Sequence, residues 1–467
     1  MQNTKKIIPP PVGLAIFAIL GPSIVWCSEY IGSGELIIAT RTGAILGTSI
    51  MWAVVIGVLL KFWIGMSGAH YTVCTGEGMI DMFGRIPGPK NWPVWIILVA
   101  QFVSGAIGMS GVAAASAIFV SEITHMDIRI CGLIIVGFAV AITWSGKFEW
   151  LKYIMSIFVF LIIIGVFNVV VQVLPDFKTF VSGLIPSVPH VPEWAIAIKE
   201  PKNPWRIILP LIGWGAGGFA SQVFYTYWII GAGYGLTEKD VYGKPADLDR
   251  LKKLTTDDAT NLKKWIKIVH LDAIIAVVLG TSITLGFVIA GARILGPMQI
   301  APKGNEVALQ LTHIFSSNWG KLGASLFLIG GTAALISTLV GQMAGWPRLV
   351  SDAFRLCFPK VVKNIQWKWQ FRITLLIFLA TNLVIVYVLG KQPVFLLTIS
   401  SILDGVVLTA FQALLIFVAL YYVMPKMFTV DVYKIIKPKS IIFIILIITF
   451  IVFSYFSIFQ VPKLFFN

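Results

Sequence analysis

The chain alternates between long apolar segments and short polar connections along almost all of its length. A helix that crosses a bilayer needs about 20 mainly apolar residues. Eleven segments meet this requirement, and they are centred near residues 28, 57, 106, 138, 163, 219, 280, 333, 382, 409 and 450. The pattern therefore predicts an all-α membrane protein with eleven transmembrane helices, folded as a single transmembrane domain over residues 1–467.

The first apolar segment carries a polar interruption, GPSIVWCSEYIGSGE, at residues 21–35. Residues 32–34 are Gly-Ser-Gly, and they lie between Glu29 and Glu35 in the middle of a predicted span. Because unpaired backbone groups cost several kcal/mol in hydrocarbon, an interrupted helix at that depth must be buried in protein or line a cavity. Carboxylates at this depth are also costly, and they mark ion sites, substrate sites or proton relays. We therefore expect a functional site around Glu29, Gly32 and Glu35.

A second glycine-rich interruption falls in the sixth apolar segment, IGWGAGGFASQVFYTYW, at residues 212–228. Gly217 follows Gly32 by 185 residues, with five predicted spans between the starts of the two segments. Close helix packing would explain either glycine cluster alone. Paired interrupted helices in two inverted halves instead indicate the midplane site of a secondary transporter. We predict a 5+5 inverted repeat, with halves over about residues 13–174 and 206–424 and an additional helix at 441–459.

Composition narrows the class of protein. With 57% hydrophobic and 12% charged residues, the chain differs from soluble globular proteins, in which about a quarter of residues are charged. The net charge of +15 is explained by the positive-inside rule, so we expect the lipid bilayer and not nucleic acid as a partner. With the N-terminus inside, inside loops hold about 24 Lys and Arg against about 11 outside. This predicts an integral plasma membrane protein with a cytoplasmic N-terminus and an outer C-terminus.

The motifs at the two interruptions resemble the NRAMP metal-ion transporters, a family with the LeuT fold. GPSIVWCSEYIGSGE aligns without gaps with the family pattern GPGFLxSxAYxDPGN, and ASQVFYTYW at 220–228 resembles the sixth-span MPHVIYLHS. TRTGA at 40–44, CTGEG at 74–78 and STLVGQ at 337–342 are similar to the family's LQAGA, VTGKD and GTYAGQ. The resemblance covers most of the chain and implies a LeuT-type transporter that moves a divalent cation by alternating access.

The resemblance also implies a site whose chemistry differs from that of the family. The family binds a transition metal through the Asp and Asn of DPGN and the Met of MPH, with help from backbone carbonyls. This chain has Gly32, Glu35 and Ala220 at those positions. Loss of the thioether favours a hard metal such as Mg²⁺ or Mn²⁺, which prefers oxygen ligands. Glu29 offsets the lost Asp, so we predict Glu29 and Glu35 as metal ligands and exposed carbonyls at Gly32 and Gly217.

Proton coupling is not expected from the same alignment. The two histidines of the family's sixth span map to Gln222 and Tyr227, neither of which titrates near neutral pH. Its third-span acids map near Gly108 and Gly111. The chain is in this respect more similar to the NRAMP-related magnesium transporters, which lack both the Met ligand and proton coupling. Asp404, in the tenth predicted span, is a candidate third ligand or relay acid, or a structural carboxyl kept protonated or hydrogen-bonded.

Aromatic residues support a different cargo. Trp26, Tyr30, Trp214 and Tyr225 crowd the two interruptions, and aromatic faces combined with a carboxylate bind ammonium ligands. A small organic cation or an amino acid on the same fold is therefore the alternative to a metal ion, while ordinary packing is the alternative role of the rings. The sequence carries no nucleophile paired with a base, so we expect no enzyme and no cofactor beyond the transported cation. We expect a monomer, although the sequence does not fix the oligomeric state.

Overall fold

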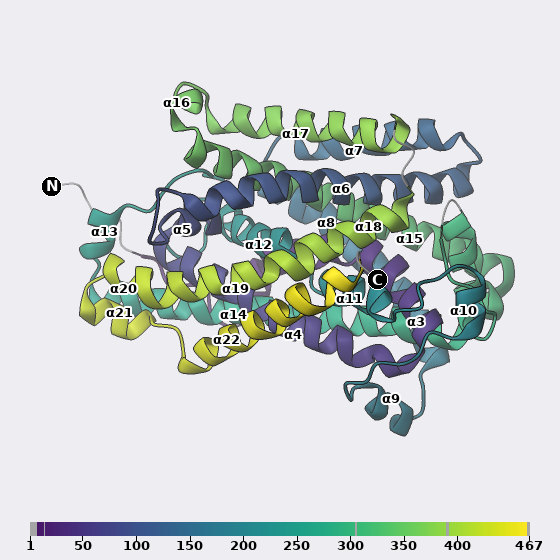
Figure 1. The fold of residues 1–467 in the computed structure, drawn as a ribbon. Coiled ribbons are helices and arrows are strands. Elements are labelled where there is room, and N and C mark those ends of the chain that lie inside the picture. Colours follow the sequence, from purple (N-terminus) through teal and green to yellow (C-terminus); the bar gives the residue numbers. More distant parts are fainter. Residues whose placement is uncertain (1–6, 14, 304–305, 389–391, 465–467) are drawn as a thin grey trace.

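The computed structural model describes residues 7–13, 15–303, 306–388 and 392–464, and the regular elements of this part of the chain are all helices. Figure 1 shows long helices that run along one common axis, with short helices at the two ends. One end carries α5 (Met79–Gly84), α13 (Leu248–Lys252), α16 (Pro359–Val362), α20 (Met424–Met427) and α21 (Val430–Ile436), and the opposite end carries α9 (Phe177–Gly183) and α10 (Glu193–Ala197).

Eight helical stretches of the described residues are long and apolar enough to cross a membrane, and each coincides with a predicted span. Their main helices are α4 (Met51–Thr75), α6 (Trp92–Thr124), α11 (Trp205–Trp214) with α12 (Phe219–Ala232), α14 (Thr256–Ala290), α15 (Val307–Cys357), α17 (Trp367–Leu383), α18 (Pro393–Ile402) with α19 (Leu408–Val418), and α22 (Ser440–Tyr455). The other three predicted spans correspond to α7 (Ile128–Thr143), α8 (Phe148–Val173) and the interrupted first stretch. The all-helical membrane class is thus confirmed, while the count of eleven stays a prediction.

The first stretch has the interruption that its glycines predict. α2 (Pro22–Tyr30) ends at an extended Ile31, with φ −81° and ψ 95°. The chain resumes as the π-helical η1 (Gly34–Ala39) and continues into α3 (Thr40–Leu46). π-Helical turns inside longer helices are frequently found at functional sites. The break therefore leaves the two glutamates on different elements, Glu29 in α2 and Glu35 in η1.

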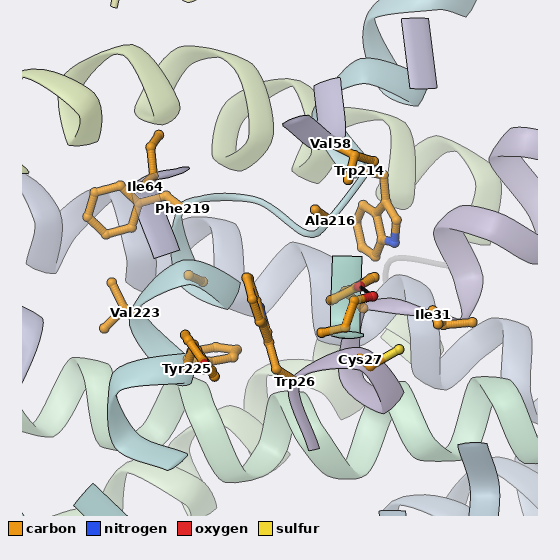
Figure 2. Packing of buried hydrophobic residues seen from close by; sticks show 14 of the residues in the cluster. Trp26, Cys27, Ile31, Val58, Ile64, Trp214, Ala216, Phe219, Val223 and Tyr225 are labelled. Atoms are coloured by element: carbon orange, nitrogen blue, oxygen red, sulfur yellow. Dashed lines mark hydrogen bonds between the residues drawn. The ribbon is translucent and has the colours of Figure 1, made fainter. Parts of the chain in front are cut away.

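The sixth predicted span is broken in the same way, between α11 and α12. Gly215 leaves helical geometry with ψ 122°, and Ala216 and Gly217 follow with φ of 58° and 68°. Glycine adopts this left-handed region at little steric cost. Figure 2 shows the irregular segment running past Ala216 between Trp214 and Phe219.

The two breaks pack directly against each other. A Cβ atom added to Gly34 would lie 1.3 Å from Cδ1 of Trp214, and one added to Gly217 would lie 2.3 Å from Cβ of Ser221. Neither position has room for a side chain. Gly217 therefore allows the left-handed backbone conformation, and Gly34 allows the first break to approach the second closely.

Candidate functional site

A small cavity lies beside the two breaks, and residues of α2, α11, α12, α15, α18 and η6 (Leu403–Val407) line it. Its volume is about 20 Å³, and a buried water needs about 10–15 Å³. Pockets for small organic ligands have volumes of about 300–1,000 Å³. In this conformation the cavity thus has room for a single ion or a water molecule. Residues that line it include Glu29, Trp214, Gly217, Ala220, Gln342 and Asp404.

Glu29 projects from α2 into this cavity and is held by a chain of hydrogen bonds. Its side chain is 4% exposed, and Oε2 accepts a hydrogen bond from Oγ of Ser221 at 2.5 Å. The same hydroxyl accepts from Nε1 of Trp26 at 3.1 Å. Trp26 is in turn fixed by stacking on Tyr225, with ring centroids 4.4 Å apart, and Figure 2 shows the two rings face to face. The carboxylate is therefore oriented before any cargo arrives.

Asp404 enters the cavity from η6, on the opposite side. Its Oδ1 accepts from Nε2 of Gln101 at 2.6 Å, and its Oδ2 accepts from the backbone N–H of Ala220 at 3.3 Å. Gln101 is fixed by its own oxygen, which accepts from Nε1 of Trp346 at 2.9 Å. These contacts hold Asp404 at the start of α12. They also assign an orienting role to Gln101, which the sequence did not single out.

Gln342 contributes an amide oxygen to the same wall. Its Oε1 is buried and has no hydrogen-bond donor among the described residues. Buried polar atoms are normally hydrogen-bonded, so this acceptor is suited to a cation or a water molecule. With Glu29 and Asp404 it forms an all-oxygen set, which hard cations prefer. No three His, Cys, Asp or Glu side chains of the described chain are close enough to hold a metal ion by themselves, so a cation would also need such amide, hydroxyl or water oxygens.

Glu35 does not line the cavity. Its Oε2 accepts from the backbone N–H of Gly32 at 3.0 Å, and its Oε1 accepts from Oγ1 of Thr284 at 3.4 Å. The carbonyl of Gly32 is also engaged, because it accepts from the N–H of Leu36 at 2.8 Å. The structure therefore brings Glu29 together with Asp404, and it turns Glu35 toward its own helix end.

Three further predicted positions lie around the second break. Ala220 and Gly217 line the cavity, whereas Gln222 lies outside the lining. Nε2 of Gln222 donates to the carbonyl of Ala216 at 2.7 Å. The carbonyl of Gly217 accepts from Nζ of Lys61 at 2.8 Å. The sequence predicts an exposed carbonyl at Gly217, whereas in this structure that carbonyl is hydrogen-bonded to the ammonium of Lys61.

Lys61 is the residue of the site region that the motif comparison missed. It lies in α4, fully buried, within the apolar run VVIGVLLKFWIGM. An ionisable side chain at this depth is by itself a signal of function, and that signal was present in the sequence. Alignment to the family motifs did not reveal it because none of the matched motifs includes Lys61.

The four predicted aromatic residues divide into two groups. Tyr30 and Trp214 line the cavity, and Nε1 of Trp214 has no acceptor among the described residues. Trp26 and Tyr225 pack behind Glu29 instead, where Tyr225 donates its hydroxyl proton to Asp272 at 3.0 Å. Tyr30 and Trp214 thus form part of the cavity wall, and Trp26 and Tyr225 support the carboxylate of Glu29. Together the four rings do not enclose a ligand-sized cage.

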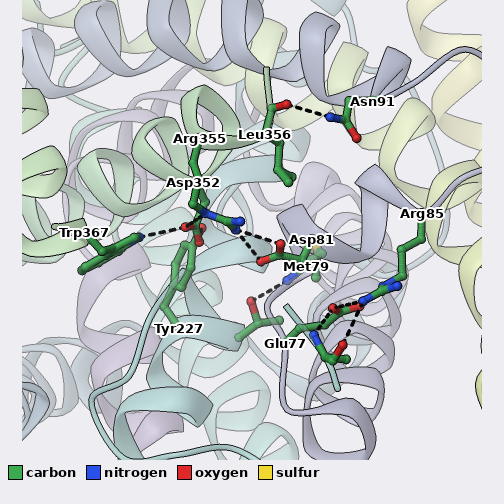
Figure 3. Close-up of polar contacts among 12 residues, drawn as sticks. Glu77, Met79, Asp81, Arg85, Asn91, Tyr227, Asp352, Arg355, Leu356 and Trp367 are labelled. Atoms are coloured by element: carbon green, nitrogen blue, oxygen red, sulfur yellow. Dashed lines mark hydrogen bonds and ion pairs between the residues drawn. The ribbon is translucent and has the colours of Figure 1, made fainter. Parts of the chain in front are cut away.

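The end of the molecule that carries α5 is closed by a polar network, drawn in Figure 3. Arg355, near the end of α15, donates to both oxygens of Asp81 at 2.8 and 2.9 Å. Asp352 accepts from the hydroxyl of Tyr227 at 2.9 Å and from Nε1 of Trp367 at 2.9 Å. Burial raises the pKa of Asp81, and the guanidinium of Arg355 opposes that shift. The network ties α5, α12 and α15 together below the cavity.

The opposite end is closed by a second ion pair. Arg41 in α3 pairs with Glu200, which is 7% exposed and follows α10. Arg41 also donates to the carbonyl of Pro302 at 2.9 Å. Because Glu29 and Asp404 are 4% and 5% exposed, the cavity is shielded from both ends in this conformation.

Comparison with known proteins agrees with the motifs. Residues 23–198 match the family model for natural resistance-associated macrophage protein-like (Nramp) proteins. This part of the chain is thus similar to the Nramp family. An uncharacterized protein from Pasteurella multocida is 22% identical over 219 residues, which cover 46% of this chain and 48% of that protein. The divalent metal cation transporter MntH from Yersinia enterocolitica is 25% identical over 119 residues, which cover 23% and 29%. The matched part thus spans less than half of each of these relatives.

Solved structures show a similar fold over almost the whole chain. A variant of the manganese transporter from Eremococcus coleocola has a TM-score of 0.69 at 13% identity, covering 99% of this chain and 90% of that one. Mhp1, a nucleobase-cation-symport-1 family transporter, has a TM-score of 0.51 at 13% identity, covering 93% and 91%. At such identity the likeness concerns the fold alone, and it is the LeuT-type fold that the motifs imply.

Proposed function

We propose that this NRAMP-related chain is a secondary transporter or facilitator that moves a divalent cation by alternating access. The observation that carries the proposal is the ion-sized cavity, which lies between two broken helices and is lined by two buried carboxylates. In transporters built from inverted repeats, discontinuous helices form the substrate site at the repeat interface. The proposed architecture is the 5+5 repeat with eleven transmembrane helices, an inner N-terminus and an outer C-terminus in the plasma membrane, acting as a monomer.

The proposed ligands in the shielded state are Glu29, Asp404 and the amide oxygen of Gln342, completed by water. Glu35 stays a predicted ligand, and its carboxylate acts on the cavity through its charge while it is bound to Gly32.

Hard metals such as Mg²⁺ and Mn²⁺ are the proposed cargo, because the lining offers oxygen and no thioether. Mg²⁺ typically keeps several waters and takes one or two carboxylates from the protein. The alternative cargo, a small organic cation or amino acid, is disfavoured by the cavity volume of about 20 Å³. Transport without NRAMP-type proton coupling is proposed because Gln222 and Tyr227 stand where the family has histidines.

Flux measurements in proteoliposomes test this function. Wild-type protein should take up Mn²⁺ or Mg²⁺ without acidifying the lumen, whereas Glu29→Gln and Asp404→Asn should lose uptake while remaining folded. The size of the effect follows from the cost of removing one partner of a buried charge pair, about 2–5 kcal/mol. Glu193→Gln, which changes an exposed carboxylate, is the matched control and should behave as wild type.

Three outcomes would contradict parts of this proposal. Uptake of amines with no uptake of Mn²⁺ or Mg²⁺ would replace the metal by the organic cargo. Undiminished uptake by Glu35→Gln would remove Glu35 from the site, and loss equal to that of Glu29→Gln would return it to the ligand set. Cation-driven acidification of the lumen would show that the chain has a proton path.

A further inference from the structure

Lys61 makes hydrogen bonds that only a charged lysine satisfies. Its Nζ donates to the backbone carbonyls of Ile212 at 2.9 Å, Gly213 at 2.7 Å and Gly217 at 2.8 Å. A lysine ammonium has three donors and no acceptor, so its three N–H groups match the three carbonyl oxygens. An uncharged amine would present a lone pair to one of these oxygens. The geometry therefore requires the ammonium form.

These carbonyls belong to a helix end that needs an external partner. The last carbonyls of an α-helix have no intrahelical donor, and α11 ends at Trp214. Other donors serve the carbonyls of Leu211, Trp214 and Ala216. Lys61 serves the oxygens of Ile212, Gly213 and Gly217. The ammonium is thus the group that completes the hydrogen bonding of the break.

The surrounding electrostatics favour a cation at this point. The C-terminal end of a helix carries a partial negative charge. In secondary transporters with broken helices, unwound carbonyls and half-helix C-termini hold the coupling Na⁺ or H⁺. The end of α11 therefore forms a cation site, and the cation that occupies it is the ammonium of Lys61 in α4.

We propose that Lys61 is a tethered cation that permanently occupies a monovalent-cation site at the break between α11 and α12. The site adjoins the cavity of Glu29 and Asp404, because Gly213 and Gly217 belong to both, and Lys61 acts there as a positioning residue for the unwound backbone. Transport consequently needs no dissociable Na⁺ or K⁺ at this position. The inference concerns the helix break and does not depend on the identity of the cargo.

The test compares two substitutions of Lys61 by thermal unfolding of purified protein. Lys61→Ala opens a space beside three carbonyls, so its Tm should fall in choline chloride and recover in a saturable manner with NH₄⁺, K⁺ or Na⁺ at equal ionic strength, as expected when a ligand binds only the folded state. Lys61→Met fills the space with an uncharged chain, so its Tm should fall without recovery. Lys178→Ala, at an exposed lysine, should show neither effect.

The wild-type protein provides a measurement that needs no variant. Its Tm and its uptake of cargo should be the same in choline as in Na⁺, K⁺ or NH₄⁺. A saturable dependence of the wild type on one of these ions would overturn the proposal, because the site would then take a free ion. A Tm of Lys61→Ala equal to wild type in choline, or a lowered Tm that no monovalent cation restores, would also overturn it.

Because unfolding is followed without any cargo, failure of divalent transport would leave this result standing. Conversely, if the protein transports Mn²⁺ or Mg²⁺ but no monovalent cation restores the Tm of Lys61→Ala, the proposed function stands and the tethered-cation proposal fails.

Discussion

Individual side chains in the cavity wall are held by neighbouring hydrogen-bond partners. Ser221, which also lines the cavity, is the clearest case, because one hydroxyl accepts from Trp26 and donates to Glu29. Gln101 plays the same part for Asp404. Loss of a partner that orients a metal ligand typically costs about 10–100-fold in metal affinity.

Ser221→Ala should therefore weaken cation binding by about 10–100-fold, since Glu29 loses its hydrogen-bond donor and its fixed orientation. Isothermal titration of purified protein with Mn²⁺ measures the change. Ser282→Ala is the matched control, because the exposed hydroxyl of Ser282 bonds only within α14, to the carbonyl of Val278. Equal affinities for the two variants would mean that Ser221 does not position a ligand.

Sequence alone located part of this site. The apolar context predicted Glu29 and Asp404 as functional carboxylates, and both line one cavity. It also paired Glu29 with Glu35, on the assumption that a break at Gly32 would turn both into the same space. The structure differs because the backbone N–H of Gly32 needs an acceptor and Glu35 supplies it locally. The spacing of the residues does not show whether a carboxylate will face a distant cavity or accept from a nearby backbone N–H.

The broken helices depend on glycine for a reason that becomes visible only when the two breaks are seen together. Gly34 in η1 lies against the indole of Trp214 at the end of α11, so residues 180 positions apart in the sequence share one close contact. The glycine pattern predicted that both helices would break. The direct contact between them requires the folded arrangement.

Gly34→Ala should consequently destabilise the fold by about 1–3 kcal/mol, the usual cost of forcing extra volume into a packed site. Unfolding in mixed micelles measures the difference in free energy. Gly137→Ala in α7 is the control, because a Cβ at Gly137 meets no atom within 4 Å and alanine is the better helix former. If both substitutions had the same small effect, the close packing of the breaks would not contribute to stability.

An ion pair lies toward each end of the molecule. Arg355 pairs with Asp81 of α5 (Figure 3), and Arg41 of α3 pairs with Glu200, which follows α10. In the proposed alternating-access cycle each end opens in turn, and the low exposure of Glu29 and Asp404 fits a shielded intermediate of that cycle.

The overall architecture was the most predictable level of this protein. Long apolar segments must form helices in a bilayer because every backbone group needs an internal partner, and eight of the predicted spans are membrane-length helices of the described chain. The resemblance to the NRAMP family, read from short motifs, is confirmed by the family model over residues 23–198. Side-chain partnerships such as that of Lys61 with α11 were not predictable in this way, because they join segments about 150 residues apart.

The central claim, that a divalent cation binds between the two broken helices, is tested most directly by anomalous diffraction from crystals grown with Mn²⁺. We expect one strong anomalous peak inside the cavity, within coordination distance of the carboxylates of Glu29 and Asp404, and its loss in Glu29→Gln. A cavity without a peak at a Mn²⁺ concentration that supports uptake, or a peak that persists unchanged in Glu29→Gln, would show that the cation does not bind there.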